Sequence, residues 1–194
     1  YVTSSTIVST AYNHTLCASW EVVPYTISYN LNGGTVATAN PTTYTVETDT
    51  FTLNNPTKTG YTFAGWTGTG LSSATKTVTI SKGSTGNRTY TAQWTINTYT
   101  ITSNTYSDMV YQTWAQGSTL NGNAGTVSIN NVTGSPTVSA SIAYGTKVTL
   151  KAVANKGYKF VCWYYTNGVS FSESSTCTIT IDADTTKHTI NAKF

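Results

Sequence analysis

Four lysines gather in one acid-free stretch near the C-terminal end of the sequence. Lys147 and Lys151 alternate with the apolar residues of an expected strand, and Lys156 and Lys159 follow at the next turn. Ammonium groups held on one surface can bind an anionic polymer, such as a host glycosaminoglycan or wall teichoic acid. The alternative is a solvated strand face that discourages pairing at a sheet edge. The formal net charge of only +3 favours this second interpretation.

Residues 103–120 form a second candidate binding segment. An exposed aromatic loop containing Tyr111 and Trp114 would indicate a ligand site for a host glycan or protein. However, Tyr106, Met109 and Trp114 recur at helical spacing, so a short helix that caps the core is the alternative. Large apolar residues are more often buried than displayed, which favours packing in the core or at an interface.

The remaining polar residues do not form a catalytic or metal-binding pattern. His14 and His188 stand at equivalent positions of repeated strand ends, and Arg88 fills that position in a third copy. A general base would not be expected to repeat in this way. Asp182 and Asp184 lack the glycine and the distal acid of an EF-hand loop, so a solvated turn is expected. We therefore expect no enzyme activity, no cofactor and no metal.

The cysteine pattern does not indicate a stapled or metal-bound fold. Three cysteines are an odd number, which excludes a full disulfide framework. Cys162 and Cys177 could flank a hairpin and pair, but proximity alone does not satisfy disulfide geometry, so isolated thiols are the simpler interpretation. The spacing of the cysteines and histidines does not resemble a zinc site.

The composition predicts β structure. Only 9% of the residues are charged, and the abundant threonine, tyrosine and valine suit a pleated, half-buried surface. The sequence contains no apolar run long enough to cross a bilayer, no signal peptide and no basic-aromatic motif of a nucleic-acid reader. Because it starts with Tyr1 rather than Met, we expect a piece of a longer protein, with any secretion signal or wall anchor outside it.

A repeated pattern must position these side chains. Residues 60–66 (GYTFAGW) return as residues 157–163 (GYKFVCW). Each copy is followed by a strand that ends in an aromatic residue, at residues 88–94 and 188–194, and a third such ending covers residues 14–20. The pattern indicates a tandem array of small β modules, which more often hold something at a distance than enclose a catalytic pocket.

Three segments follow from this repeat. Residues 1–20 are expected to be the C-terminal strands of a preceding module, and complete modules are expected at residues 25–94 and 99–194. The linker between the complete modules, residues 95–98, is too short to let them swing freely, so a semi-rigid rod is expected.

The repeated aromatic residues are expected to form the module cores. Tyrosine and phenylalanine two residues apart project to one face of a strand. The glycine before Trp66 can mark a bulge, which re-aims the next side chain. Because aromatic residues in alternating strands are usually buried, core packing is favoured over stacking against a carbohydrate. The expected core residues are Tyr61, Phe63, Trp66, Trp94, Tyr158, Phe160, Trp163 and Phe194.

Both complete modules carry ordered motifs. The first has Tyr-x-Ile-x-Tyr-Asn-Leu-Asn-Gly-Gly from residue 25, Asn-Pro from residue 55, Gly-Tyr-x-Phe-x-Gly-Trp from residue 60 and Tyr-Thr-Ala-Gln-Trp from residue 90. It closely resembles the B-repeats of internalin-type bacterial surface proteins, also called Listeria-Bacteroides repeats. The second has Tyr-Gly-Thr-x-Val-Thr-Leu-x-Ala from residue 144 and is similar to divergent relatives of that repeat. The similarity is poor over residues 103–136.

This resemblance implies a fold and a function. The family implies compact β-grasp-like (ubiquitin-like) modules, here in an elongated array, in secreted and wall-attached bacterial proteins without known catalytic residues. We therefore expect a non-enzymatic, extracellular repeat region that acts as a stalk or spacer and adhesion module on the bacterial cell surface. The alternative is a specific binding module for a host glycan, glycosaminoglycan or protein, through the lysines or the segment at residues 103–120.

Overall fold

The computed structural model describes residues 5–7, 9, 12, 13, 15, 17, 20–108 and 118–194. These residues are mainly β, as the sequence predicts, and their helical structure is limited to one short 3₁₀ helix. Much of the strand fragment expected at residues 1–20 lies outside the described residues, as do His14, Met109, Tyr111 and Trp114.

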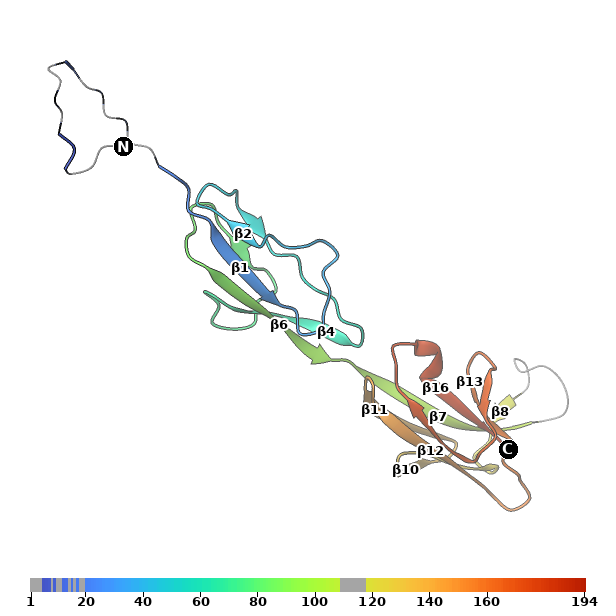
Figure 1. The fold of residues 1–194 in the computed structure, drawn as a ribbon. Helices are drawn as coiled ribbons and strands as arrows, with labels where there is room; N and C mark the ends of the chain where they lie inside the picture. Colours follow the sequence, from blue (N-terminus) through green and yellow to red (C-terminus); the bar gives the residue numbers. More distant parts are fainter. Residues whose placement is uncertain are drawn as a thin grey trace.

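One four-stranded sheet organises the first module (Figure 1). Its first and last strands, β1 and β6, are parallel neighbours in the middle, so the chain enters the sheet at one end and leaves at the other. In spatial order the strands are β2 (Thr43–Tyr44), β1 (Tyr25–Asn30), β6 (Arg88–Ile96) and β4 (Tyr61–Gly68). A separate antiparallel pair consists of β3 (Phe51–Thr52) and β5 (Thr79–Ile80).

The core of the first module surrounds Trp66, which is fully buried. The indole Nε1 of Trp66 donates a hydrogen bond to Asn55 Oδ1 at 3.0 Å, so the one polar group of this side chain is satisfied. Phe63 and Trp94 pack against the core, with their ring centroids 5.5 Å apart. The other buried members are Ile27, Tyr44, Leu53, Val78, Ile80, Tyr90 and Ala92.

The glycine before Trp66 forms a β-bulge, as the sequence predicts. The register between β4 and β6 shifts between Phe63 and Gly65. Gly65 has a φ of 143°, which residues with a side chain rarely adopt, and a Cβ there would lie 2.6 Å from the backbone nitrogen of Thr75. The bulge brings the rings of Phe63 and Trp66 to a centroid distance of 5.6 Å.

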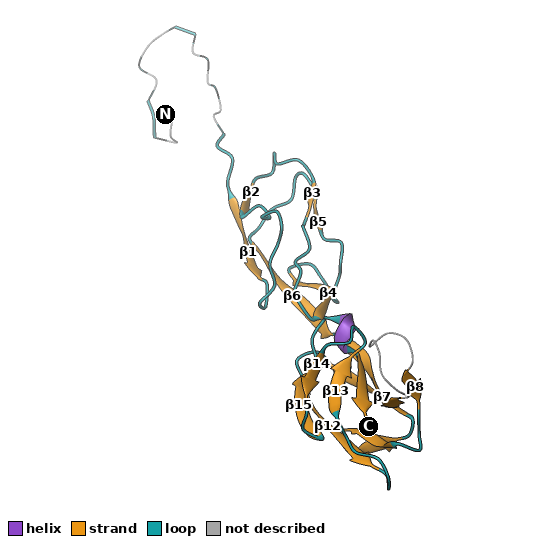
Figure 2. Cartoon of the chain, turned by 90° about the vertical axis from the view of Figure 1, so that its right-hand side faces the viewer, coloured by secondary structure: helices purple, strands orange, loops and turns teal. Residues whose placement is uncertain are grey.

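The second module contains two sheets (Figure 2). Its first and last strands, β7 and β16, are again parallel neighbours. One sheet has, in spatial order, β11 (Thr137–Ala143), β7 (Thr98–Asp108), β16 (Thr189–Lys193), β13 (Cys162–Tyr165) and β14 (Ser170–Ser172), with β8 (Ser118–Leu120) also paired to β7. The other has β10 (Val132–Gly134), β9 (Gly125–Ile129), β12 (Lys147–Ala154) and β15 (Thr176–Thr180). The 3₁₀ helix η1 (Thr185–Lys187) precedes β16.

A second core lies between these two sheets around Trp163, which is fully buried. The indole Nε1 of Trp163 donates to the backbone oxygen of Ser174 at 3.1 Å. Trp163 faces Ala192 across β13 and β16, as Trp66 faces Ala92 across β4 and β6. The other buried members are Ile101, Ala124, Val127, Ile129, Val138, Val148, Leu150, Ala152, Ile181, Ile190 and Phe194, and Phe160 packs against them.

Three aromatic residues lie where the sequence interpretation did not put them. Tyr158 is 40% exposed and outside the core, because it ends a turn in which its N–H donates to the backbone oxygen of Asn155. Tyr61 is half-buried, and its ring contacts Tyr144 of the second module rather than the first core. Tyr106, which the helical interpretation included, lies in strand β7.

Because the two cores are separate, loss of the Trp66 side chain should destabilise the first module alone. We expect Trp66→Ala to lower the free energy of unfolding of that module by about 3–5 kcal/mol, the usual cost of truncating a buried tryptophan. Calorimetry should show one transition at a lower temperature and the other unmoved. Trp20→Ala is the control, since Trp20 is 90% exposed. Equal shifts of both transitions would contradict the presence of separate cores.

Candidate functional site

Lys147 and Lys151 project from the outer face of β12. This strand alternates between exposed residues and the buried residues Val148, Leu150 and Ala152. The two exposed lysines are four residues apart on one face, so about 13 Å separates their Cα atoms. Both ammonium groups therefore belong to one solvent-exposed surface.

The strand neighbours of these lysines carry hydroxyl groups. Lys151 lies between Ser128 of β9 and Thr176 of β15 in one row across the sheet, and Lys147 is paired with Thr180. Strands β9, β10, β12 and β15 contain no acidic residue. No ion pair among the described residues involves Lys147 or Lys151. Their positive charge is therefore not neutralised by a neighbour.

The lysines of β12 do not protect a sheet edge. β12 pairs with β9 on one side and with β15 on the other, so it lies inside the sheet. The interpretation of these lysines as guards against edge pairing is therefore wrong. The adjacent edge strand, β15, carries no charged residue.

The other two predicted lysines lie in the loop that follows β12. Lys156 and Lys159 are both exposed, on either side of Gly157 and Tyr158. The structure thus brings Lys147 and Lys151 together on one face and places Lys156 and Lys159 on a separate loop.

Only part of the segment at residues 103–120 is described. The half-buried Tyr106 has its ring centroid 6.3 Å from that of Tyr164, and its backbone oxygen accepts a hydrogen bond from the N–H of Phe194. Tyr111 and Trp114, the aromatic residues proposed as ligand contacts, lie outside the described residues.

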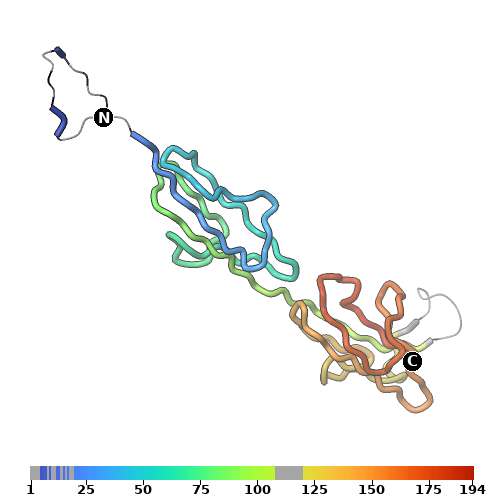
Figure 3. The backbone as a smooth tube through the Cα atoms, viewed as in Figure 1, coloured from blue at the N-terminus to red at the C-terminus, as the bar shows by residue number. Residues whose placement is uncertain are grey.

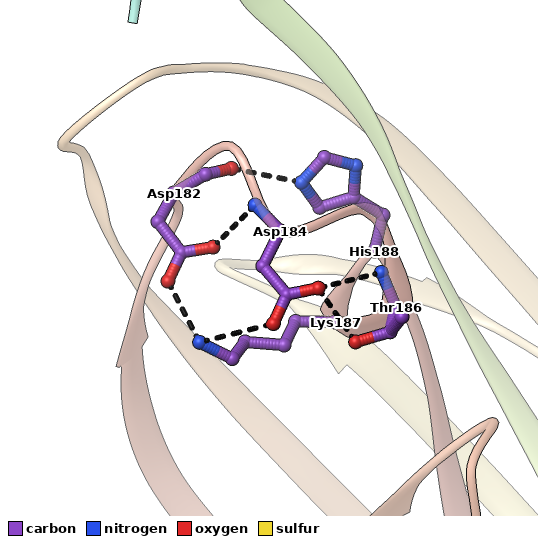
Figure 4. Close-up of polar contacts among 5 residues, drawn as sticks. All are labelled: Asp182, Asp184, Thr186, Lys187 and His188. Atoms are coloured by element: carbon purple, nitrogen blue, oxygen red, sulfur yellow. Dashed lines mark hydrogen bonds and ion pairs between the residues drawn. The ribbon is translucent and has the colours of Figure 1, made fainter. Parts of the chain in front are cut away.

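The turn before β16 holds a charged network (Figure 4). Lys187 Nζ lies 2.9 Å from Asp182 Oδ2 and 3.5 Å from Asp184 Oδ2. Asp184 caps η1, because its carboxylate accepts a hydrogen bond from the Thr186 N–H at 3.0 Å. His188 Nε2 donates to the backbone oxygen of Asp182 at 2.9 Å, since a carbonyl oxygen can only accept. Sequence reasoning treated this segment as a solvated turn, although an Asp two residues before a threonine is a capping signal.

These contacts change the pKa values of the network. The hydrogen bond from Lys187 lowers the pKa of Asp182, and the hydrogen bond from the Thr186 side chain lowers the pKa of Asp184. The hydrogen bond to Asp182 in turn raises the pKa of Lys187. All three charges are thus engaged with one another, and the network stabilises the turn that leads into β16.

The residues at equivalent strand starts pack on tyrosines. Arg88 Nε donates to Tyr44 Oη at 2.9 Å, and this hydrogen bond raises the pKa of Arg88. The His188 ring lies against Tyr99, with 4.6 Å between centroids. Arg88 and His188, which occupy equivalent positions in the two modules, therefore both pack against a tyrosine where the last strand of the module begins.

The described residues do not show a metal centre. They contain no group of three or more His, Cys, Asp or Glu side chains that could hold a metal ion. Cys162 of β13 is buried and Cys177 of β15 is half-buried, and both are free thiols in different sheets. Burial raises the pKa of Cys177.

Among the described residues, no helix has the length and apolarity needed to span a membrane.

The junction between the modules is built around Asn97. This residue alone separates β6 from β7, so the strands occupy most of the linker expected at residues 95–98. Figure 3 shows a single segment of the chain passing between the two modules. The Asn97 N–H donates to the backbone oxygen of Gly60 at 2.9 Å, and its own backbone oxygen accepts from the Tyr144 N–H at 2.9 Å. The Thr62 hydroxyl donates to Asn97 Oδ1 at 2.7 Å. Asn97 is therefore hydrogen-bonded to both modules.

Tyrosine packing closes the same junction. The Tyr61 and Tyr144 rings meet at 65°, with 6.2 Å between centroids. Gly60 is buried, and a Cβ added there would collide with the Tyr144 ring. The Lys58 ammonium lies 4.3 Å from the centroid of the Tyr61 ring. The second module thus sits on the Gly60–Tyr61 turn of the first.

Comparison with known families finds two matched segments in the chain. The Listeria-Bacteroides repeat domain matches residues 25–93, and the divergent InlB B-repeat domain matches residues 125–194. These matches confirm the resemblance seen in the sequence, and each matched segment contains one of the two buried tryptophans. No curated protein matches the chain, and no solved structure matches it.

Removal of the Lys187 ammonium should raise the pKa of both aspartates in the folded protein. Their folded-state pKa values lie below the ordinary value of about 3.9, so the network contributes stability above that pH and loses it as pH falls through the folded-state values. A carboxyl NMR titration of Lys187→Ala should show Asp182 nearer the ordinary value, with a smaller rise for Asp184, whose pKa is lowered mainly by the hydrogen bonds from Thr186. Lys76→Ala, at an exposed lysine of the first module, should change neither. Unchanged values in Lys187→Ala would show that the ion pairs are not the cause.

Proposed function

We propose, given that residues 25–93 belong to the Listeria-Bacteroides repeat family and residues 125–194 to the divergent InlB B-repeat family, that the chain is a spacer in an extracellular bacterial surface protein. Repeats of these families are typical of bacterial surface proteins and are generally non-enzymatic structural modules. In this proposal, residues 25–94 and 99–194 are two modules held end to end, and adhesive parts are carried by or beyond them. The assignment of residues 1–20 to a preceding module stays a prediction.

The observation that carries the spacer proposal is the junction at Asn97. Domains joined by an ordinary linker move relative to one another unless their interface is large. Here only one residue separates the strands. Its backbone is hydrogen-bonded to both modules, and its side chain is hydrogen-bonded to the first. The packing of Tyr144 on Tyr61 restricts the same hinge. A junction without slack keeps the distance between the two modules constant, which is what a spacer requires.

The strand order supports the proposal of a β-grasp-like module. In each module the first and last strands are parallel and central, with an antiparallel strand on either side, as in a β-grasp sheet. The described residues do not include an α-helix packed across that sheet, and in the second module a further sheet covers the core instead.

Loss of the Tyr144 ring should loosen the junction. Thr79 and Thr178 are both exposed, and each can be replaced by a non-canonical residue that carries a nitroxide label. Pulsed electron paramagnetic resonance would then report the distance between the two modules. We expect a narrow distance distribution for the wild-type chain and one about twofold wider for Tyr144→Ala, since free domains sample many orientations. Tyr158→Ala is the matched control, because it removes an exposed tyrosine away from the junction. A wild-type distribution as broad as that of Tyr144→Ala would rule out a rigid spacer.

A specific binding role is the second candidate, and the lysine surface favours it. Lys147 and Lys151 lie on one exposed face among serine and threonine side chains, with no acidic residue in the surrounding strands. Unneutralised ammonium groups beside hydroxyl groups suit a sulfated or carboxylated glycan, or an anionic cell-wall polymer. This role is compatible with a spacer, because neither lysine takes part in the hydrogen bonds or ring contact of the Asn97 junction.

Heparin affinity tests this second candidate. If the surface binds anionic glycans, the wild-type chain should be retained on heparin at low salt and released as salt rises, because such contacts are screened. The variant Lys147→Ser/Lys151→Ser should be released at lower salt. Lys76→Ser/Lys82→Ser removes the same charge from the first module and is the control, and Lys156→Ser/Lys159→Ser tests the separate loop. Equal weakening by the β12 pair and the control pair would show that net charge alone is responsible.

A further inference from the structure

The two Gly-Tyr turns of the chain have the same local structure. The Tyr61 N–H donates to the backbone oxygen of Lys58 at 3.1 Å, and the Tyr158 N–H donates to that of Asn155 at 3.0 Å. The glycine before each tyrosine has a positive φ, 78° in the first turn and 93° in the second. Both turns lead into the strand that carries the buried tryptophan. The two turns are therefore equivalent sites in successive modules.

The two turns differ in burial, because only the first is covered by another residue. The first is covered by the Tyr144 ring, which packs on Tyr61 and leaves no room for a Cβ on Gly60. In the second, a Cβ added to Gly157 would have no atom within 4 Å. Tyr158 is 40% exposed, and no aromatic ring among the described residues contacts it. The same surface is thus buried in one module and open in the other.

The register of the last strands extends this equivalence. Phe160 packs on Phe194 with 5.9 Å between centroids, as Phe63 packs on Trp94 with 5.5 Å. Beyond Trp94, β6 continues past Tyr61 and delivers Asn97 to the oxygen of Gly60. If the chain continued beyond Phe194 as a strand with the same pairing, it would run alongside Tyr158 and reach Gly157, as β6 reaches Gly60. The open turn and the end of β16 therefore lie together, at the end of the second module away from the first (Figure 1).

We propose that the loop at residues 156–159 is a docking surface for another repeat module carried on the same polypeptide. The Tyr-Gly turn of that module would cover Gly157 and pack on Tyr158, as Tyr144 covers Gly60 and packs on Tyr61. This inference rests on the proposed spacer function and says what would dock at the open turn of the second module. The second module itself, which docks on the equivalent turn of the first module, is the observation that supports a repeat module as the partner.

A second copy of this chain fits the open turn less well through its first module. By the register of the paired strands, Val46 is the first-module counterpart of Tyr144. Val46 is 38% exposed and cannot supply the ring that covers the glycine. A module that presents an aromatic residue at this position, as the second module does, supplies the missing contact.

An extended chain tests the proposal. It consists of residues 1–194 followed directly by a second copy of residues 95–194, so that Phe194 takes the place of Trp94 before the same linker. Nitroxide labels at Thr178 of the second module and at its copy report the new junction, and labels at Thr79 and Thr178 report the first. We expect both distance distributions to be narrow. Tyr158→Ala should widen only the new one, about twofold, and Tyr61→Ala only the first.

The outcomes separate this inference from the function on which it rests. A broad distribution at the new junction beside a narrow one at the first would overturn the docking surface and leave the spacer proposal intact. Broad distributions at both junctions would overturn both. Ultracentrifugation of the unextended chain provides another check. Self-association that Tyr158→Ala abolishes would assign the surface to contacts between separate chains and would also overturn the proposal.

Discussion

The parallel pairing of the first and last strands is the constraint on which each module depends. Parallel neighbours cannot be joined by a tight hairpin, so a long crossover must connect them. In the first module the crossover carries Trp66, and in the second it carries Trp163, and each tryptophan lies opposite an alanine of the last strand. The pairing therefore fixes both the position of the core and the ends at which the chain enters and leaves.

Because the chain has few charged residues, the stability of the modules depends mainly on these cores. Among the described residues, ion pairs form only between Lys82 and Asp49 and within the Lys187 network, and all of these groups are exposed in part. Exposed pairs of this kind contribute little to the free energy of folding. In the sheet of β9, β10, β12 and β15, the exposed positions carry many hydroxyl groups, and the two lysines of β12 are the only charged residues of these strands.

Local features were the ones that could be predicted from the sequence. The alternation along β12, the bulge at Gly65 and the burial of both tryptophans follow from side-chain period and backbone sterics within a few residues. The difference in burial between Tyr61 and Tyr158 could not be predicted, because the two residues stand in nearly the same motif. Only the Tyr144 ring, which packs on Tyr61, distinguishes them. Likewise, alternation indicates which face a lysine occupies but not whether its strand lies inside the sheet or at the edge.

The parallel strands also determine how the chain carries a pulling force. Tension on the two ends draws β1 and β6 in opposite directions along their own axes, and it does the same to β7 and β16. In this shear arrangement the hydrogen bonds of a ladder are loaded together, whereas strands joined as a hairpin would unzip one bond at a time. Since only Asn97 separates β6 from β7, the load passes from one ladder to the next with little slack to take up. Resistance to stretching is thus a consequence of topology and does not require a covalent cross-link.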